Sequence, residues 1–327
     1  MIVRNILVSG ASGIVGYGIL RSLGKTGGQF RLVGTTIYED SVAEGFCDVF
    51  EKAPLTNDEK YIPWLLTIIG KHKVDLLIPG IEADMYKWVE HVAEIENHGA
   101  KVLLNTRELI ELCKDKWLFY EKLNSFKTPY AIESLLKPNF DILSDKFGLP
   151  FLLKPRRGFG SKGIVRVGDQ DEFEKHRDAV GVTLMAQPIV GTDEEEYTTS
   201  AFCDGRGGFF AFMTLKRRLS KEGFTEKAEV VDLVGIQEAL DVLCEIFKPL
   251  GPTNFQFRKH NGILKLLEIN PRVSSSTSIR AAFGYNECQM SVDYFIEGKK
   301  PTQPLISHGR AVRYIEDFIF FDNPKVV

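Results

Sequence analysis

Residues 253–273 read TNFQFRKHNGILKLLEINPRV, two largely apolar runs joined at Asn261-Gly262, a dipeptide typical of β-hairpin turns. Successive side chains of a strand point to opposite faces, so Glu268 and Asn270 share one face of the second run. Gln256 can lie beside them on the neighbouring strand. Three converging oxygen ligands suit Mg²⁺, which prefers oxygen ligands together with water and substrate phosphates. An exposed strand face is the alternative, but polar side chains in so apolar a strand need a reason.

A second segment, FLLKPRRGFGSKGI at residues 151–164, combines a strand with a basic, glycine-rich loop. The strand delivers Lys154, and the backbone N–H groups and cations of the loop suit an anionic ligand. Arg272, just beyond the candidate metal ligands, can reach a transferring phosphoryl group. Taken alone, the loop is equally compatible with a basic hairpin turn.

The first 105 residues alternate short β-like runs with helical patterns. This alternation predicts a parallel sheet covered by helices on both faces. The expected strands are 6–8, 31–36, 74–79 and 101–104, and the expected helices are 15–23, 61–71 and 84–97. A helical pattern follows from Thr106 to Leu123, so we place the first domain boundary near 105–115.

The remaining chain is rich in β-like segments separated by turn signals such as Asp204-Gly205 and Asn261-Gly262. These signals predict antiparallel hairpins, with one helix among them at 233–250. The expected strands are 151–154, 163–167, 184–189, 197–203, 209–214, 254–257 and 263–269.

Residues 10–16, GASGIVG, follow a strand and open a helix, which is the setting of a dinucleotide-binding loop. Glu39 or Asp40 lies roughly where a ribose-binding acid would stand, about 20 residues further on. The class of function this implies is a nucleotide-dependent oxidoreductase or epimerase. Short-chain dehydrogenases and sugar epimerases use Tyr and Lys four residues apart, and none of the ten tyrosines has Lys at that spacing. A tight turn in a parallel sheet is therefore the favoured interpretation.

Composition narrows the class of protein further. The 327 residues hold 41 Lys and Arg against 44 Asp and Glu, a formal charge of −3, which predicts neither nucleic acid nor a membrane surface as partner. Five scattered cysteines without a C-x-x-C pair favour a reducing compartment, so we expect a cytoplasmic protein. No stretch approaches the ~20 apolar residues that cross a bilayer. The histidines lack zinc-binding spacing, and a G-x-S-x-G elbow is absent.

The lysine with its glycine loop and the Gln256…Glu268-Ile-Asn270-Pro-Arg272 pattern resemble those of ATP-grasp enzymes. The chain is most similar to the ATP-grasp module of the carbamoyl-phosphate synthetase large subunit, and the resemblance covers nearly its whole length. It implies an α/β plus α+β protein, with a Rossmann-like parallel α/β domain at 1–108 that precedes a two-lobed ATP-grasp fold. The small lobe with the glycine-rich loop would span 109–184, and the C-terminal lobe with the metal-binding strands 185–327.

The resemblance also implies an ATP site. Lys116 matches the basic residue that contacts ATP phosphate, and Lys154 matches the lysine between the lobes. Glu196 matches the acid that bonds the ribose, with Glu194 and Glu195 as alternatives or as a solvated charge run. The other ATP-binding residues it implies are Gly158, Gly160, Ser161, Gly163, Gln187, Pro188 and Ile189. Gln187 replaces the acid that is usual in the adenine-binding segment.

For the metal, the resemblance assigns Gln256, Glu268 and Asn270 as ligands of Mg²⁺ or Mn²⁺. Arg272 and Lys154 are the catalytic residues it implies. The expected reaction uses ATP to turn a substrate carboxylate into an acyl-phosphate, which an amine then captures, with release of ADP and phosphate. Carbamoyl-phosphate-synthetase-like phosphotransfer to a small carboxylate is the alternative, although a single ATP-grasp unit favours a stand-alone ligase.

The sequence leaves the substrates unnamed beyond a small-molecule carboxylate and an amine. Arg280 could hold a substrate carboxylate, with a solvent-facing helix residue as the alternative. Glu82 and Asp84 could hold an ammonium group, with a helix N-cap as the alternative. Because acyl-phosphates hydrolyse readily, we expect mobile covers at 158–163 and 216–223. A homodimer is common among such enzymes and stays open here.

Overall fold

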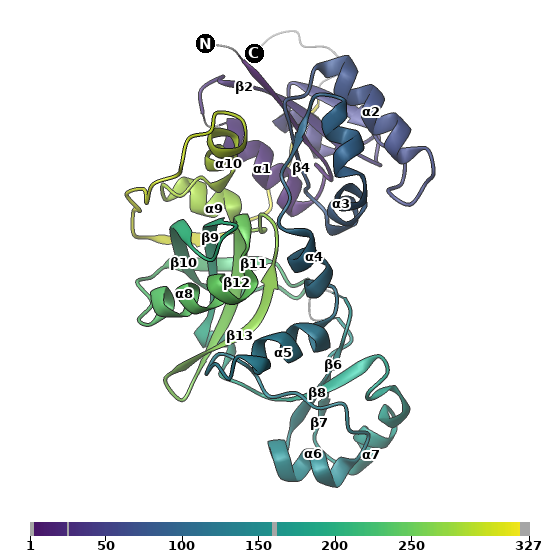
Figure 1. Cartoon of the computed structure of the whole chain (residues 1–327), viewed down its shortest axis with the longest axis vertical. Coiled ribbons are helices and arrows are strands. Elements are labelled where there is room, and N and C mark those ends of the chain that lie inside the picture. The colour runs from purple at the N-terminus through teal and green to yellow at the C-terminus, as the bar shows by residue number, and fades with distance from the viewer. Residues whose placement is uncertain (1–2, 25, 159–161, 321–327) are drawn as a thin grey trace. The chain divides into compact units, whose positions relative to one another are not determined.

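The computed structural model in Figure 1 describes residues 3–24, 26–158 and 162–320. The described residues fall into two compact units. One comprises those of Met1–Leu103 together with Ala311–Val327, and the other comprises Leu104–Arg310.

The first unit contains a five-stranded sheet in the order β3-β2-β1-β4-β5. All four pairings are parallel, as the alternating pattern predicts. The strands are β1 (Arg4–Val8), β2 (Phe30–Thr36), β3 (Val49–Lys52), β4 (Leu76–Ile78) and β5 (Lys101–Val102). The helices are α1 (Ile14–Gly24), α2 (Tyr61–His72) and α3 (Glu82–Asn97), with the 3₁₀ turn η1 (Val42–Phe46). Only β3 and η1 have no counterpart among the expected elements.

The glycine turn between β1 and α1 is explained by close packing. Gly10 has a φ of +55° and its carbonyl accepts the Gly13 N–H at 2.9 Å. A Cβ on Gly16 would lie 2.2 Å from the Gly10 carbonyl oxygen, and a Cβ on Gly80 would lie 2.1 Å from that of Ser9. These glycines let α1 begin directly against the ends of β1 and β4, which is what the tight-turn interpretation expects.

The second unit is built on a six-stranded sheet in the order β13-β12-β9-β10-β11-β14 (Figure 1). The pairings from β13 to β11 are antiparallel, which confirms the predicted hairpins. The strands are β9 (Glu196–Asp204), β10 (Phe209–Leu219), β11 (Thr225–Val230), β12 (Leu250–His260), β13 (Ile263–Asn270) and β14 (Arg310–Val312). Two of them, β11 and β14, were not expected from the sequence.

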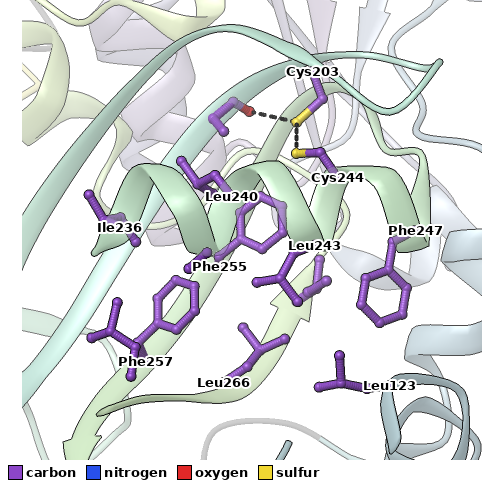
Figure 2. Packing of buried hydrophobic residues seen from close by; sticks show 14 of the residues in the cluster. Leu123, Cys203, Ile236, Leu240, Leu243, Cys244, Phe247, Phe255, Phe257 and Leu266 are labelled. Carbon is purple, nitrogen blue, oxygen red and sulfur yellow. Dashed lines mark hydrogen bonds between the residues drawn. The ribbon is translucent and has the colours of Figure 1, made fainter. Parts of the chain in front are cut away.

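One face of this sheet is apolar and is covered by α8 (Ile236–Phe247). In Figure 2 the side chains of Leu240 and Leu243 on this helix lie among those of Phe255 and Phe257 from β12. Strand alternation then sends the residues between these phenylalanines to the opposite face. Burial of the apolar face therefore fixes the direction in which Gln256 points.

A second, three-stranded sheet in the order β7-β6-β8 has its own apolar core. Its strands are β6 (Phe151–Pro155), β7 (Val165–Val167) and β8 (Leu184–Pro188), and the chain beside it forms α6 (Phe140–Phe147), α7 (Gln170–Glu174) and η2 (Arg177–Ala179). This sheet continues to Pro188.

The helical pattern from Thr106 to Leu123 forms two helices, α4 (Arg107–Cys113) and α5 (Lys116–Ser125). Asp115 separates them because its side chain accepts the Trp117 N–H at 2.9 Å and so caps the second helix. Both helices pack on the core of the larger sheet, not on that of the smaller one. Two further helices, α9 (Thr277–Ala282) and α10 (Glu287–Phe295), follow β13.

None of the described helices has the length and apolar character that crossing a bilayer requires.

Candidate active site

The predicted metal-binding residues meet on one wall of the second unit. Gln256 of β12 pairs directly with Glu268 of β13, and Asn254 pairs with Asn270. The Asn270 amide donates to Glu268 Oε1 at 3.0 Å. Arg272 in turn donates to Asn270 Oδ1 at 3.2 Å. The structure thus brings these residues to one place, because Glu268 and Asn270 share one face of β13 and Gln256 of β12 lies opposite Glu268.

Glu196, the expected ribose ligand, is buried and engaged by two arginines. Its Oε1 accepts from Arg217 Nε and Nη2 at 3.1 and 2.9 Å, and its Oε2 accepts from Arg258 Nε and Nη2 at 3.0 and 2.9 Å. Only 4% of Glu196 is exposed, whereas Glu194 is exposed. This arrangement supports a role in positioning the two arginines more than a ribose contact. Asp193, at the start of η3 (Asp193–Glu195), also pairs with Arg258 at 2.5 Å.

Arg217 is a site residue that the sequence reasoning missed. It lies on β10 and donates through Nη2 to Gln256 Oε1 at 2.6 Å. Burial lowers the pKa of its guanidinium, but arginine stays charged in proteins. Its position could have identified it, because it lies two residues after Leu215 on the same strand. Alternate residues of a strand share one face, and on this strand both of these residues are buried.

Residues 216–223 were expected to form a mobile cover over the active site, but part of this segment belongs to a regular β-sheet. Lys216 pairs with Tyr197 of β9 on one side and with Glu229 of β11 on the other. Only the end of the segment forms a turn, in which the Ser220 N–H donates to the Phe224 carbonyl at 2.8 Å. A moving cover can therefore involve this turn, but not the strand that precedes it.

Lys154 extends from β6 of the small sheet, where it pairs with Met185 of β8. Burial lowers its pKa to about 8. Glu268 opposes that shift, while Lys116 reinforces it through charge repulsion. The amine therefore lies within electrostatic reach of the metal-binding wall and of the second expected phosphate ligand.

Lys116, the first residue of α5, is tied to the start of the glycine-rich loop. Its Nζ donates to the Gly158 carbonyl at 2.6 Å and its N–H to the Arg156 carbonyl at 2.8 Å. Arg156 also pairs with Asp115 at 2.9 Å. Gly158 and Gly163 adopt φ angles of +118° and +74°, which favour glycine. The predicted ligands Gly160 and Ser161 lie outside the described residues.

Gln187 of the expected adenine-binding segment is buried and donates through Nε2 to Ser134 Oγ at 2.7 Å. Its side chain therefore holds this segment in place just before Pro188 and Ile189. Beyond them, the Gly191 N–H donates to His260 Nδ1 at 3.2 Å and links this segment to the β12–β13 hairpin.

Arg280 does not face solvent, so that alternative is wrong. Its side chain is fully buried and donates to Ser274 Oγ at 2.7 Å, Asn254 Oδ1 at 2.8 Å and Glu287 Oε1 at 3.3 Å. Thr198 Oγ1 also accepts from it at 3.1 Å. Such a network supports the wall from within, and direct contact with a substrate would require it to open.

Glu82 and Asp84 belong to the first unit and stand in the first turn of α3. The N-cap residue is Ile81, so the N-cap alternative is wrong for both. Asp84 is buried and accepts from Thr56 Oγ1 at 2.6 Å. Burial is the main cause that raises the pKa of Tyr61, and the negative charge of the Asp84 carboxylate raises this pKa further. These contacts explain Asp84 as a structural residue of its unit.

The wall carries an excess of positive charge that suits a polyphosphate. Five cations here outnumber the two carboxylates, the buried Glu196 and the half-buried Glu268. They are Lys116, Lys154, Arg217, Arg258 and Arg272. Among the described residues, no three His, Cys, Asp or Glu side chains gather as a metal site. A Mg²⁺ ion here would therefore depend on one carboxylate, amide oxygens and substrate phosphates, which is a common donor set for this ion.

Known proteins resemble this chain in sequence and in fold. A model of the family described as "ATP-grasp in the biosynthetic pathway with Ter operon" matches residues 184–318. The arginine-specific carbamoyl phosphate synthase large chain of Bacillus subtilis is 24% identical over 279 residues, which is 76% of this chain and 26% of that protein. The chain thus spans about a quarter of the length of such curated relatives.

Solved structures show the same architecture. N5-carboxyaminoimidazole synthetase from Staphylococcus aureus, solved with ADP, has a TM-score of 0.71 at 18% identity, covering 93% of this chain and 80% of that one. The biotin carboxylase domain dimer of 2-oxoglutarate carboxylase from Hydrogenobacter thermophilus, solved with MgADP and bicarbonate, has a TM-score of 0.69 at 14% identity, covering 95% and 74%. The chain therefore has the ATP-grasp fold. Its sequence is similar to those of carbamoyl phosphate synthase large chains, which is the resemblance that its motifs imply.

Proposed function

We propose that the protein is an ATP-dependent, ADP-forming ligase that activates a small carboxylate as an acyl-phosphate and joins it to an amine. The observation that carries this proposal is the wall formed by Glu268, Asn270 and Arg272, with Lys154 approaching it from the small sheet. The match to the family model and the ADP-bound structures of the same fold support it.

In this proposal the nucleotide phosphates lie against Lys154 and Lys116, which neutralise their charge. A substrate carboxylate oxygen attacks the γ-phosphorus of ATP, and ADP leaves with the electron pair of the broken bond. Arg272 stabilises the transferred phosphoryl group. The amine then attacks the acyl carbon and phosphate leaves, so no side-chain nucleophile is needed.

Glu268 and Asn270 would hold a Mg²⁺ ion beside the phosphates. When bound, this ion would neutralise charge that develops on the transferred group. Gln187 keeps the base-binding segment in register, and Glu196 keeps two arginines directed at the site. These residues therefore orient the reactants and supply positive charge, which is most of what phosphoryl transfer requires.

ADP formation in a matrix of carboxylates and amines tests the proposal. We expect ADP only when ATP, one carboxylate and one amine are all present, and we expect Glu268→Gln to abolish it. ADP formation with bicarbonate or another small carboxylate and no amine would instead indicate the phosphotransfer alternative. A wild-type protein that binds no ATP, or that forms no ADP with any pair while binding NAD, would contradict the proposal.

A further inference from the structure

We infer that the guanidinium of Arg217 takes the place of a metal ion at Gln256, so that the chain binds one divalent cation per nucleotide, through Glu268 and Asn270. In this arrangement the Gln256 side chain accepts a hydrogen bond from Arg217 and does not bind the metal. Its place in the motif would otherwise mark it as a metal ligand. The inference rests on the proposed function, since it concerns the same nucleotide site.

Arg217 reaches Gln256 across an intervening strand. The sheet order is β12-β9-β10, so Arg217 on β10 spans β9 to place Nη2 at 2.6 Å from Gln256 Oε1 on β12. Glu196 of β9 lies between them and accepts from both Nε and Nη2 of the same guanidinium. The cation is therefore held from two sides, by Glu196 and by Gln256.

This cation is a permanent part of the site. The Arg217 side chain is 6% exposed and that of Glu196 is 5% exposed, so the ion pair is shielded from water. If Arg217 moved away, the buried carboxylate of Glu196 would lose one of its two arginine partners. Leaving a buried charge without its partner is strongly unfavourable. Arg258 alone would then remain on Glu196.

A divalent ion bound to Gln256 would lie too close to this guanidinium. Mg²⁺–oxygen distances are about 2.0–2.1 Å, so the ion and Nη2 of Arg217 would be separated by no more than about 5 Å through a shared oxygen. Two cations at that distance repel strongly in a site with little water. At the other two residues the contact is weaker: the Asn270 amide donates to Glu268 Oε1, and Asn270 Oδ1 accepts from Arg272 at 3.2 Å, against 2.6 Å between Arg217 and Gln256. Arg272 is half-buried, whereas the Arg217 side chain is 6% exposed and bonded to the buried Glu196.

Arg217 can also contact the nucleotide directly. Its contacts with described residues use Nε and Nη2, which leaves the two N–H groups of Nη1 for a phosphate oxygen. The planar guanidinium suits phosphate recognition. Arg217 is thus expected to supply charge that a second metal ion would otherwise bring.

Mn²⁺ binding to the full chain in the presence of ADP, followed by electron paramagnetic resonance of the unbound ion, tests this inference. We expect one Mn²⁺ per wild-type chain. Gln256→Leu should leave the count and the Kd for Mn²⁺ unchanged within about threefold, whereas Glu268→Gln should raise this Kd on the order of tenfold or more. Two Mn²⁺ ions on the wild type, or a loss with Gln256→Leu equal to that with Glu268→Gln, would overturn the inference.

Arg217→Gln should admit a second Mn²⁺ at Gln256 and raise the Kd for ADP measured without metal. Arg206→Gln, which removes an exposed arginine in the turn after β9, is the matched control and should change neither quantity. Should Arg217→Gln fail to fold, the Gln256→Leu result decides by itself. Absence of ADP binding to the wild type would contradict the proposed function, whereas ADP binding with two Mn²⁺ ions would overturn only the inference.

Discussion

Raising the pH should weaken nucleotide binding through Lys154. Burial lowers the pKa of this amine to about 8, from an ordinary value of 10.5. Its charged form, which attracts phosphate, therefore predominates below pH 8 and is lost above it. A bound phosphate favours the charged amine and returns its pKa towards the ordinary value. Linkage then makes the Kd for metal-free ADP about tenfold higher at pH 9 than at pH 7.

Isothermal titration calorimetry in buffers of different ionisation enthalpy measures both the affinity and the protons taken up. We expect uptake of about half a proton per ADP at pH 8, rising towards one at pH 9. Lys154→Arg keeps the charge at every pH and should abolish this uptake, which separates it from protons bound by ADP itself. Equal affinity at pH 7 and pH 9, or the same pH dependence in Lys154→Arg, would refute the reasoning.

Three substitutions test the support of the site by urea unfolding followed by circular dichroism. Arg280→Ala leaves the buried carboxylate of Glu287 without its ion pair and should lower the free energy of unfolding by about 3–5 kcal/mol. Asp115→Ala removes the cap of α5 and the partner of Arg156, so a loss of about 1–3 kcal/mol is expected. Leu240→Ala opens a cavity beneath α8 and should cost about 2–5 kcal/mol.

Substitutions of exposed residues provide the controls for the three variants at buried positions. Arg206→Ala and Leu305→Ala, the latter at a residue that is 93% exposed, should each change the free energy of unfolding by less than about 0.5 kcal/mol. Losses in the buried variants no larger than those of the controls would show that the described contacts do not stabilise the second unit.

Most of the fold could be predicted because hydrophobic periodicity reports it directly. The alternation in β12 and β13 placed Gln256, Glu268 and Asn270 on one face, since Phe255 and Phe257 must turn to the core. The parallel sheet of the first unit followed from the alternation of strands and helices. Both signals are local in the sequence.

What the sequence could not show depends on contacts between distant segments. Arg217 reaches Gln256 across another strand, and no local pattern indicates which strands are neighbours. The burial of Arg280 depends on Glu287 and Asn254, which come from α10 and β12. Likewise, the engagement of Glu196 by two arginines changes the role inferred from its motif position. In each case the partner was present in the sequence, but its proximity was not.

A crystal structure of the chain with ADP and Mn²⁺, with the metal located by anomalous scattering, would examine the central claim most directly. We predict a single Mn²⁺ beside Glu268 and Asn270, with the nucleotide phosphates against Lys154. A nucleotide bound instead at residues 10–16, or a metal site from which both Glu268 and Asn270 point away, would contradict the account.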